Sequence, residues 1–87
     1  MDSVILTVKD EQSGKEYDME LPIDVPGAEL CKKLLSTLKN IEGEAFHTVE
    51  SIVLRYGQGS KQLGVEQTLE DAEIWDGDIL TIVKQHQ

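Results

Sequence analysis

The chain has one cysteine and two histidines, the residue types that most often supply a nucleophile and its base. A nucleophilic thiol needs a nearby base and an electropositive pocket that lowers its pKa. Cys31 lies on or beside the apolar stripe of a predicted helix, whereas His47 falls in the loop after that helix and His86 in the C-terminal tail. Because free cysteines are usually buried, we expect an inert Cys31 and a chain that is not an enzyme.

Three short polar patterns could hold an ion, but each lacks the required spacing. The loop after the predicted helix contains four possible metal ligands, which match no zinc signature: Glu42, Glu44, His47 and Glu50. Asp76-Gly77-Asp78 is followed at once by apolar residues, whereas a calcium loop needs oxygen ligands spread over roughly 12 residues. The glycines of residues 57–61 (GQGSK) lack the Gly-Lys-Ser/Thr order of a phosphate-binding loop. We expect a solvated loop, a tight turn and a hairpin loop, with no metal and no cofactor.

The charge balance restricts the kind of partner. Eight Lys and Arg residues against 17 Asp and Glu give a net charge of −9. Binding to nucleic acid or to anionic lipid needs clustered Lys and Arg, so we expect neither and favour a protein partner that carries positive charge. No apolar run is long enough to cross a membrane, and no secretory signal is visible. These features predict a cytoplasmic location and leave the oligomeric state open.

Apolar periodicity predicts a single α+β domain over residues 1–87. Alternation predicts strands at 4–9, 16–21, 52–56 and 79–83, with a short segment at 61–63. Leu30, Leu34 and Leu38 recur every four residues, with Cys31 and Ile41 beside them, which indicates a helix from about Pro26 to Lys39 capped near Asp24. Residues 68–72 read as one helical turn capped by Thr68. The order β-β-α-β-β(-β) predicts a mixed sheet with one helix packed across one face.

Several motifs occur in the order found in ubiquitin. They are Ser13-Gly14-Lys15 in the first hairpin, then Lys61-Gln62-Leu63, Thr68-Leu69-Glu70-Asp71 and Ile74. Together they span essentially the whole chain, which therefore resembles the ubiquitin-like (β-grasp) superfamily.

The ending Ile74-Trp75-Asp76-Gly77-Asp78-Ile79-Leu80 is most similar to the YukD/EsaB-like proteins of type VII secretion. This resemblance implies a non-catalytic, cytoplasmic accessory or regulatory component of the secretion machinery. Two alternatives stay open. A ubiquitin-like modifier or sulfur carrier is disfavoured, because residues 83–87 (VKQHQ) contain no Gly-Gly end. A small accessory subunit of a metabolic enzyme complex is the other.

The sheet face turned away from the helix is the candidate binding surface. Strand alternation places five side chains there: Lys9, Val53, Arg55, Thr81 and Val83. Ile5 and Ile79 should add apolar surface to the same face. The resemblance to ubiquitin implies that Val83 matches a valine of ubiquitin's binding patch, while Arg55 and Thr81 replace its isoleucine and histidine. A merely solvated face is the competing interpretation.

Trp75 is the sixth candidate. It follows Ile74, which should be in the core, and precedes the 76–78 turn, so we expect its indole to be at least partly exposed. Tryptophan is enriched among the residues that dominate binding energy at interfaces. Packing against neighbouring loop side chains is the alternative.

Overall fold

The computed structural model describes residues 2–86, apart from the side chain of residue 86. Along the chain the elements are β1 (Ser3–Asp10), β2 (Glu16–Pro22), α1 (Gly27–Ile41), α2 (Gly43–Phe46), β3 (Val49–Tyr56), β4 (Lys61–Gln62) and β5 (Ile79–His86). The predicted order and the single long helix are confirmed. No helix in the described part is long and apolar enough to span a membrane.

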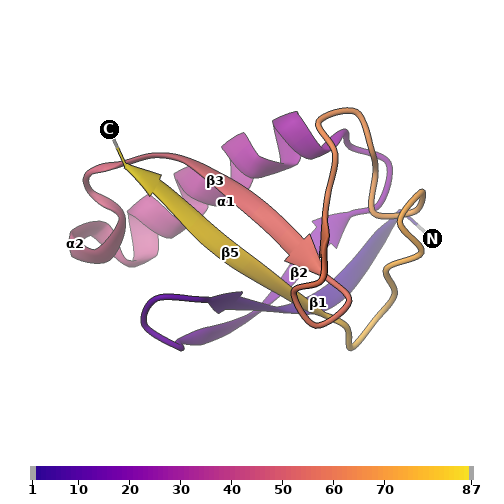
Figure 1. Ribbon diagram of the computed structural model, residues 1–87, viewed down its shortest axis with the longest axis horizontal. Coiled ribbons are helices and arrows are strands. Elements are labelled where there is room, and N and C mark those ends of the chain that lie inside the picture. Colours follow the sequence, from indigo (N-terminus) through magenta and orange to yellow (C-terminus); the bar gives the residue numbers. More distant parts are fainter. Residues whose placement is uncertain (1, 87) are drawn as a thin grey trace.

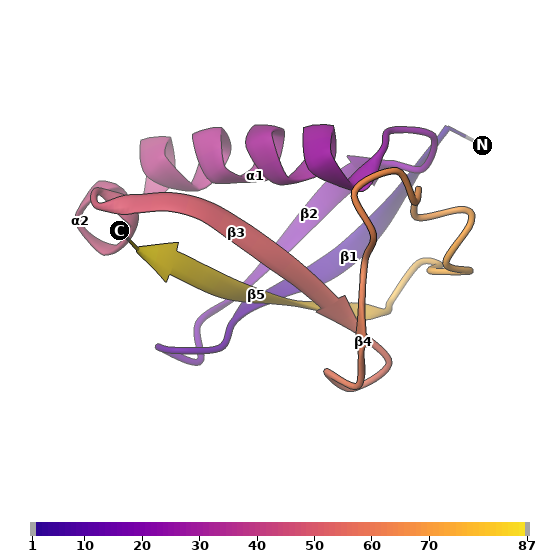
Figure 2. The same ribbon diagram turned by 45° about the horizontal axis from the view of Figure 1, so that its top comes forward.

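The strands form one five-stranded mixed sheet in the order β2-β1-β5-β3-β4. The central neighbours β1 and β5 run parallel, and the other pairs run antiparallel. Helix α1 lies across one face of the sheet (Figure 1). In the described part of the chain, no helix lies on the other face (Figure 2). The architecture therefore has two layers, one of helix and one of sheet.

The core lies between α1 and the sheet. It is built from the apolar residues that alternate along the strands and from those that recur every four residues along the helix. In β1 the alternate residues Val4, Leu6 and Val8 are buried. On α1, Leu30, Leu34 and Leu38 share one face and are at most 1% exposed. Ile41 was expected beside this stripe, but it is 54% exposed at the end of the helix.

The start of α1 differs from the sequence prediction. The N-cap residue is Pro26 and no side chain caps the helix, so the prediction of a cap near Asp24 was wrong. Backbone carbonyl groups act in place of a capping side chain. The N–H groups of Gly27 and Ala28 donate to the carbonyl oxygens of Gln67 (2.8 Å) and Val65 (2.9 Å), respectively. The loop after β4 therefore satisfies the free donors of the first turn.

The segment after α1 also differs from the solvated loop that the sequence predicted. It contains the short helix α2, and Phe46 at its end is fully buried. Glu42, Glu44, His47 and Glu50 lie around α2 without forming a site, and the described residues contain no group of three metal-ligating side chains.

The two predicted turns before β5 are present. Thr68 Oγ1 accepts from the Asp71 N–H, and Asp71 Oδ2 accepts from the Thr68 N–H, so the two residues cap one turn reciprocally. In the second turn the Asp78 N–H donates to the Trp75 carbonyl, and Gly77 has φ +88°. A residue with this positive φ is most often glycine.

Replacing Gly27 tests the close contact at the start of α1. A Cβ atom there would lie 2.2 Å from the Gly64 carbonyl oxygen, so Gly27→Ala must displace backbone. We expect a loss of about 2–4 kcal/mol in the free energy of unfolding measured by urea titration. Gly43→Ala is the matched control, because its Cβ meets nothing within 4 Å. Equal stability of the two variants would contradict this account of the helix start.

Candidate functional site

The sheet register brings five of the six predicted binding residues together. Thr81 on β5 pairs with Lys9 on β1 and with Arg55 on β3, so these three side chains form one row across the sheet. Val83 and Val53 face each other two residues further along. The row of three and the valine pair lie on the face opposite α1, which we call the open face. Lys9 is exposed and the other four are half-buried.

Arg55 has a structural role that the sequence did not reveal. Its Nε donates to the Gly59 carbonyl oxygen at 2.8 Å. That carbonyl belongs to the β3–β4 loop, where Gly57, Gln58 and Gly59 all have φ between 59° and 83°. Arg55 therefore tethers the loop to the open face, and part of its hydrogen-bonding capacity is used within the chain.

A hollow on the open face adjoins this row. It has a volume of about 760 Å³ and lies between the Lys9–Thr81 pair, the β3–β4 loop and the turn before β5. Tyr56, Lys61 and Ile79 also line it. The open face is therefore not flat, and it offers a recess in which a partner's side chain can sit.

Trp75 lies apart from the other five. The turn that carries it docks against the opposite end of β1, where Asp76 Oδ1 accepts from the Ile5 N–H at 2.7 Å and the Gly77 N–H donates to the Ile5 carbonyl. Ile74 is buried, as predicted, and Trp75 is 54% exposed. Its indole is therefore available at the surface.

Cys31 lies in a different place, a cleft of about 350 Å³ between α1 and β3. The cleft is lined mainly by aliphatic side chains such as Leu35, Ile52 and Leu63, and its lining contains no histidine within the part of the chain that the structure describes. Burial raises the pKa of the half-buried Cys31 thiol, which keeps it protonated and weakly nucleophilic. His47 is exposed and lies outside this cleft, while the side chain of His86 lies outside the described residues.

Residues 4–82 match the family described as "WXG100 protein secretion system (Wss), protein YukD". The chain belongs to the YukD family. Among known structures it is similar to the EccD5 ubiquitin-like domain from Mycobacterium xenopi, with 15% identity, a TM-score of 0.80 and coverage of 100% of this chain and 99% of that one. It is also similar to the ubiquitin-like domain of the Mycobacterium tuberculosis type VII secretion protein EccD1, with 23% identity, a TM-score of 0.75 and coverage of 95% and 99%.

A third similar structure is a chain of an ESX-5 inner-membrane complex, with 19% identity and a TM-score of 0.78. The alignment covers all of this chain and 22% of that larger one. A comparison with proteins of curated function found no match. These structures confirm that this YukD-family chain has the ubiquitin-like β-grasp fold, as its sequence motifs implied.

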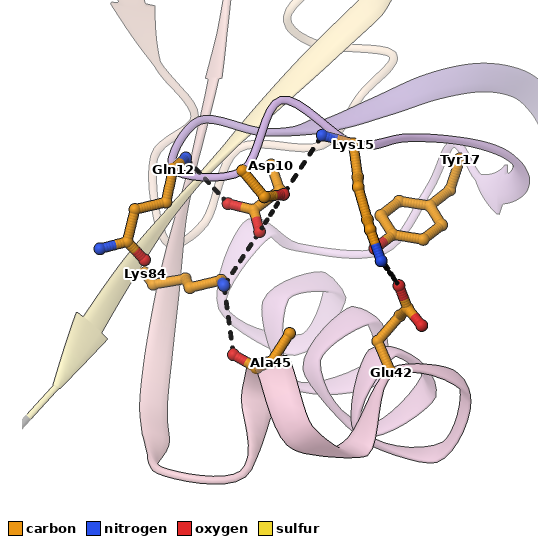
Figure 3. Close-up of polar contacts among 8 residues, drawn as sticks. Asp10, Gln12, Lys15, Tyr17, Glu42, Ala45 and Lys84 are labelled. Atoms are coloured by element: carbon orange, nitrogen blue, oxygen red, sulfur yellow. Dashed lines mark hydrogen bonds and ion pairs between the residues drawn. The ribbon is translucent and has the colours of Figure 1, made fainter.

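A buried ion pair, which the sequence analysis missed, fixes the far end of the sheet. Lys84 Nζ on β5 lies 2.9 Å from Asp10 Oδ2 at the end of β1, and the two side chains are 7% and 1% exposed. Lys84 also donates to the Ala45 carbonyl oxygen at 3.1 Å (Figure 3). Its Nζ lies 4.3 Å from the centre of the Phe46 ring. The pair therefore joins β1, β5 and α2.

Asp10 is fully satisfied by donors around it. Besides Lys84, it accepts from the Gln12 N–H and from Ser13 Oγ, both at 3.0 Å. Burial by itself raises the pKa of Asp10, but the hydrogen bonds from Lys84, Gln12 and Ser13 and the charge of Lys84 outweigh it. The pKa of Asp10 therefore lies below its ordinary value of 3.8.

A second ion pair lies nearer the surface. Lys15 Nζ is 2.8 Å from Glu42 Oε1, which also accepts from the Tyr17 hydroxyl at 3.1 Å (Figure 3). The side chain of Lys15 is 60% exposed. Because exposed ion pairs are screened by water, this pair contributes far less than the buried one.

Removing each lysine separately tests this difference. We expect Lys84→Met to lower the free energy of unfolding by about 3–5 kcal/mol, because it leaves the buried Asp10 carboxylate without its partner. Lys15→Met makes the same chemical change in the exposed pair and should leave the urea midpoint nearly unchanged. A Lys84→Met variant as stable as Lys15→Met would show that the buried pair is not needed.

The lowered pKa of Asp10 predicts an acid-dependent loss of stability. A carboxyl with a lower pKa in the folded state stabilises the fold above its unfolded pKa and loses this contribution as pH falls through the folded value. The stability difference between wild type and Asp10→Asn should therefore be constant from neutral pH down to about pH 5 and shrink below about pH 4. Urea titrations at several pH values measure it. A difference that grows on acidification contradicts the assignment.

Proposed function

We propose that this YukD-family chain is a non-catalytic protein-interaction module of a type VII secretion system. It acts on the cytoplasmic side, as an accessory or regulatory component, by docking its open face onto a larger component of the machinery. The observation that carries the proposal is the open face itself. Helix α1 lies across one face of the sheet (Figure 2), and strand pairing places the charged residues Lys9 and Arg55 and the valines Val53 and Val83 next to one another on the other face.

The composition of the open face favours a protein partner. Val53 and Val83 form an apolar pair beside the charged row that contains Lys9 and Arg55. Protein interfaces typically combine a small apolar centre with a polar and charged rim. Family membership supports the secretion context, and so does the presence of a similar domain in a chain of an ESX-5 inner-membrane complex.

The Cys31 cleft supports a role without catalysis. Among the described residues, no histidine lines the cleft, and the raised pKa of the Cys31 thiol disfavours the thiolate. The free cysteine also suits a reducing compartment, where thiols are kept unpaired.

Charged substitutions on the open face test this proposal. We expect the Val53→Asp/Val83→Asp double variant to reduce co-purification of the chain with the membrane-embedded secretion complex of its host by about tenfold or more, because buried carboxylates oppose interface formation. The matched control is the Ser36→Asp variant, which adds a carboxylate to the exposed side of α1 and should co-purify as wild type does.

Thermal melting followed by circular dichroism establishes that each variant is folded before it is compared. If the folded Val53→Asp/Val83→Asp variant remains bound as strongly as wild type, the open face is not the docking surface. Loss of binding only in Ser36→Asp would move the interface to the helical side.

A further inference from the structure

Three large, exposed apolar residues lie on neighbouring segments at one corner of the open face. Ile5 is 58% exposed, Trp75 54% and Ile79 51%. Ile79 pairs with Thr7, two residues from Ile5, and the turn that carries Trp75 is hydrogen-bonded to the Ile5 backbone. We call these three residues the Ile5 corner. Exposed apolar side chains are common singly, whereas several of them on neighbouring segments are typical of an interaction surface.

Carboxylates surround this corner on two sides. On β2, Glu20 pairs with Ile5 and Asp18 pairs with Thr7, so both stand beside the corner on the open face. On the other side lie the two carboxylates of the turn before β5. We call this group the acidic rim; it consists of Asp18, Glu20, Asp76 and Asp78.

The acidic rim carries negative charge that no cation neutralises within the described residues. Its hydrogen-bond donors are all neutral: the Thr7 hydroxyl to Asp18, the Ser3 hydroxyl to Glu20, the Ile5 N–H to Asp76 and the Trp75 N–H to Asp78. The ion pairs of the described chain join other residues, namely Lys15–Glu42, Lys33–Glu29 and Lys84–Asp10. Like charges on neighbouring segments create a local negative potential that favours a cationic partner.

We propose that the Ile5 corner binds an amphipathic helix of a partner protein, with an apolar stripe over Ile5, Trp75 and Ile79 and with Lys or Arg beside the acidic rim. This inference rests on the proposed function of the open face as a protein-docking surface, and it adds the chemistry of the partner. The partner's basic residues lie over β2 and the turn before β5. The middle of the face already holds the cations Lys9 and Arg55, which repel them.

The geometry favours a helix over an extended strand. A strand would add at a sheet edge, whereas the corner is on the face of the sheet, where side chains and not backbone groups are presented. Asp18 and Glu20 are two residues apart on β2, which is about 7 Å. One helical turn rises about 5.4 Å, so basic residues one turn apart can reach both carboxylates.

Trp75 provides a direct probe of binding, because it is the only tryptophan of the chain. The probe ligand is a synthetic amphipathic helical peptide, without tryptophan, that has leucines along one stripe and arginines along its margin. Titrated into the full chain, it should saturate a blue shift of the tryptophan fluorescence. The affinity should weaken as salt increases, since salt screens the ion pairs.

Two sets of variants separate the charged and apolar contributions. Asp18→Asn/Glu20→Gln should reduce the affinity about tenfold and flatten its salt dependence. Ile5→Ser should reduce the affinity while the salt dependence remains. The matched control, Glu66→Gln/Glu70→Gln, removes two exposed charges elsewhere on the surface and should bind as wild type does.

Several outcomes would overturn the proposal. These are no saturable change in fluorescence, equal binding of a peptide with the same composition but dispersed leucines, or unchanged affinity in Asp18→Asn/Glu20→Gln. A fluorescence shift that appears on concentrating the chain alone would assign the corner to a second copy instead. If the Asp18→Asn/Glu20→Gln variant co-purifies normally with the secretion complex while Val53→Asp/Val83→Asp does not, the docking function stands and the Ile5 corner proposal fails.

Discussion

Helix α1 lies across one face of the five-stranded sheet, and no helix of the described residues covers the other face (Figure 2). This constraint governs the arrangement of the molecule. Successive residues of a strand point to opposite faces, so each strand that contributes to the core under α1 must also present residues on the other side. On β1, Val4, Leu6 and Val8 meet the helix, and Ile5 and Lys9 are left on the open face. The open face is therefore a direct consequence of the fold, and its chemistry is set by side chains that the core does not use.

The buried ion pair between Lys84 and Asp10 holds the sheet and α2 together at the end of the molecule away from Trp75. Lys84 lies near the C-terminal end of β5, and its ammonium group contacts Asp10 from β1 and the backbone of α2 (Figure 3). Burying two charges is unfavourable unless their hydrogen bonds are complete, and here both groups are satisfied. The pair fixes β5 against β1 and α2. It thereby helps to hold Thr81 and Val83 of β5 in register with the residues that they pair with on β1 and β3.

Local patterns in the sequence predicted the architecture, but they did not predict the contacts between residues that are far apart in the sequence. The four-residue recurrence of leucines and the alternation in the strands are properties of neighbouring residues, which is why α1 and the open face could be predicted. The contact between Lys84 and Asp10 joins opposite ends of the chain, and α2 is too short to show a period, so neither was foreseen. The predicted cap near Asp24 was wrong because carbonyls from a distant loop satisfy the helix start.

The most direct test of the central claim is to map the side of the domain that a partner covers. Methyl cross-saturation NMR, with the labelled chain mixed with the unlabelled, proton-containing secretion complex that we propose as its partner, measures which methyl groups lie against that partner. The account predicts saturation of Val53, Val83, Ile5 and Ile79, while exposed methyl groups on the helical side, such as those of Ile41 and Thr37, remain unaffected. Saturation confined to the helical side would contradict it.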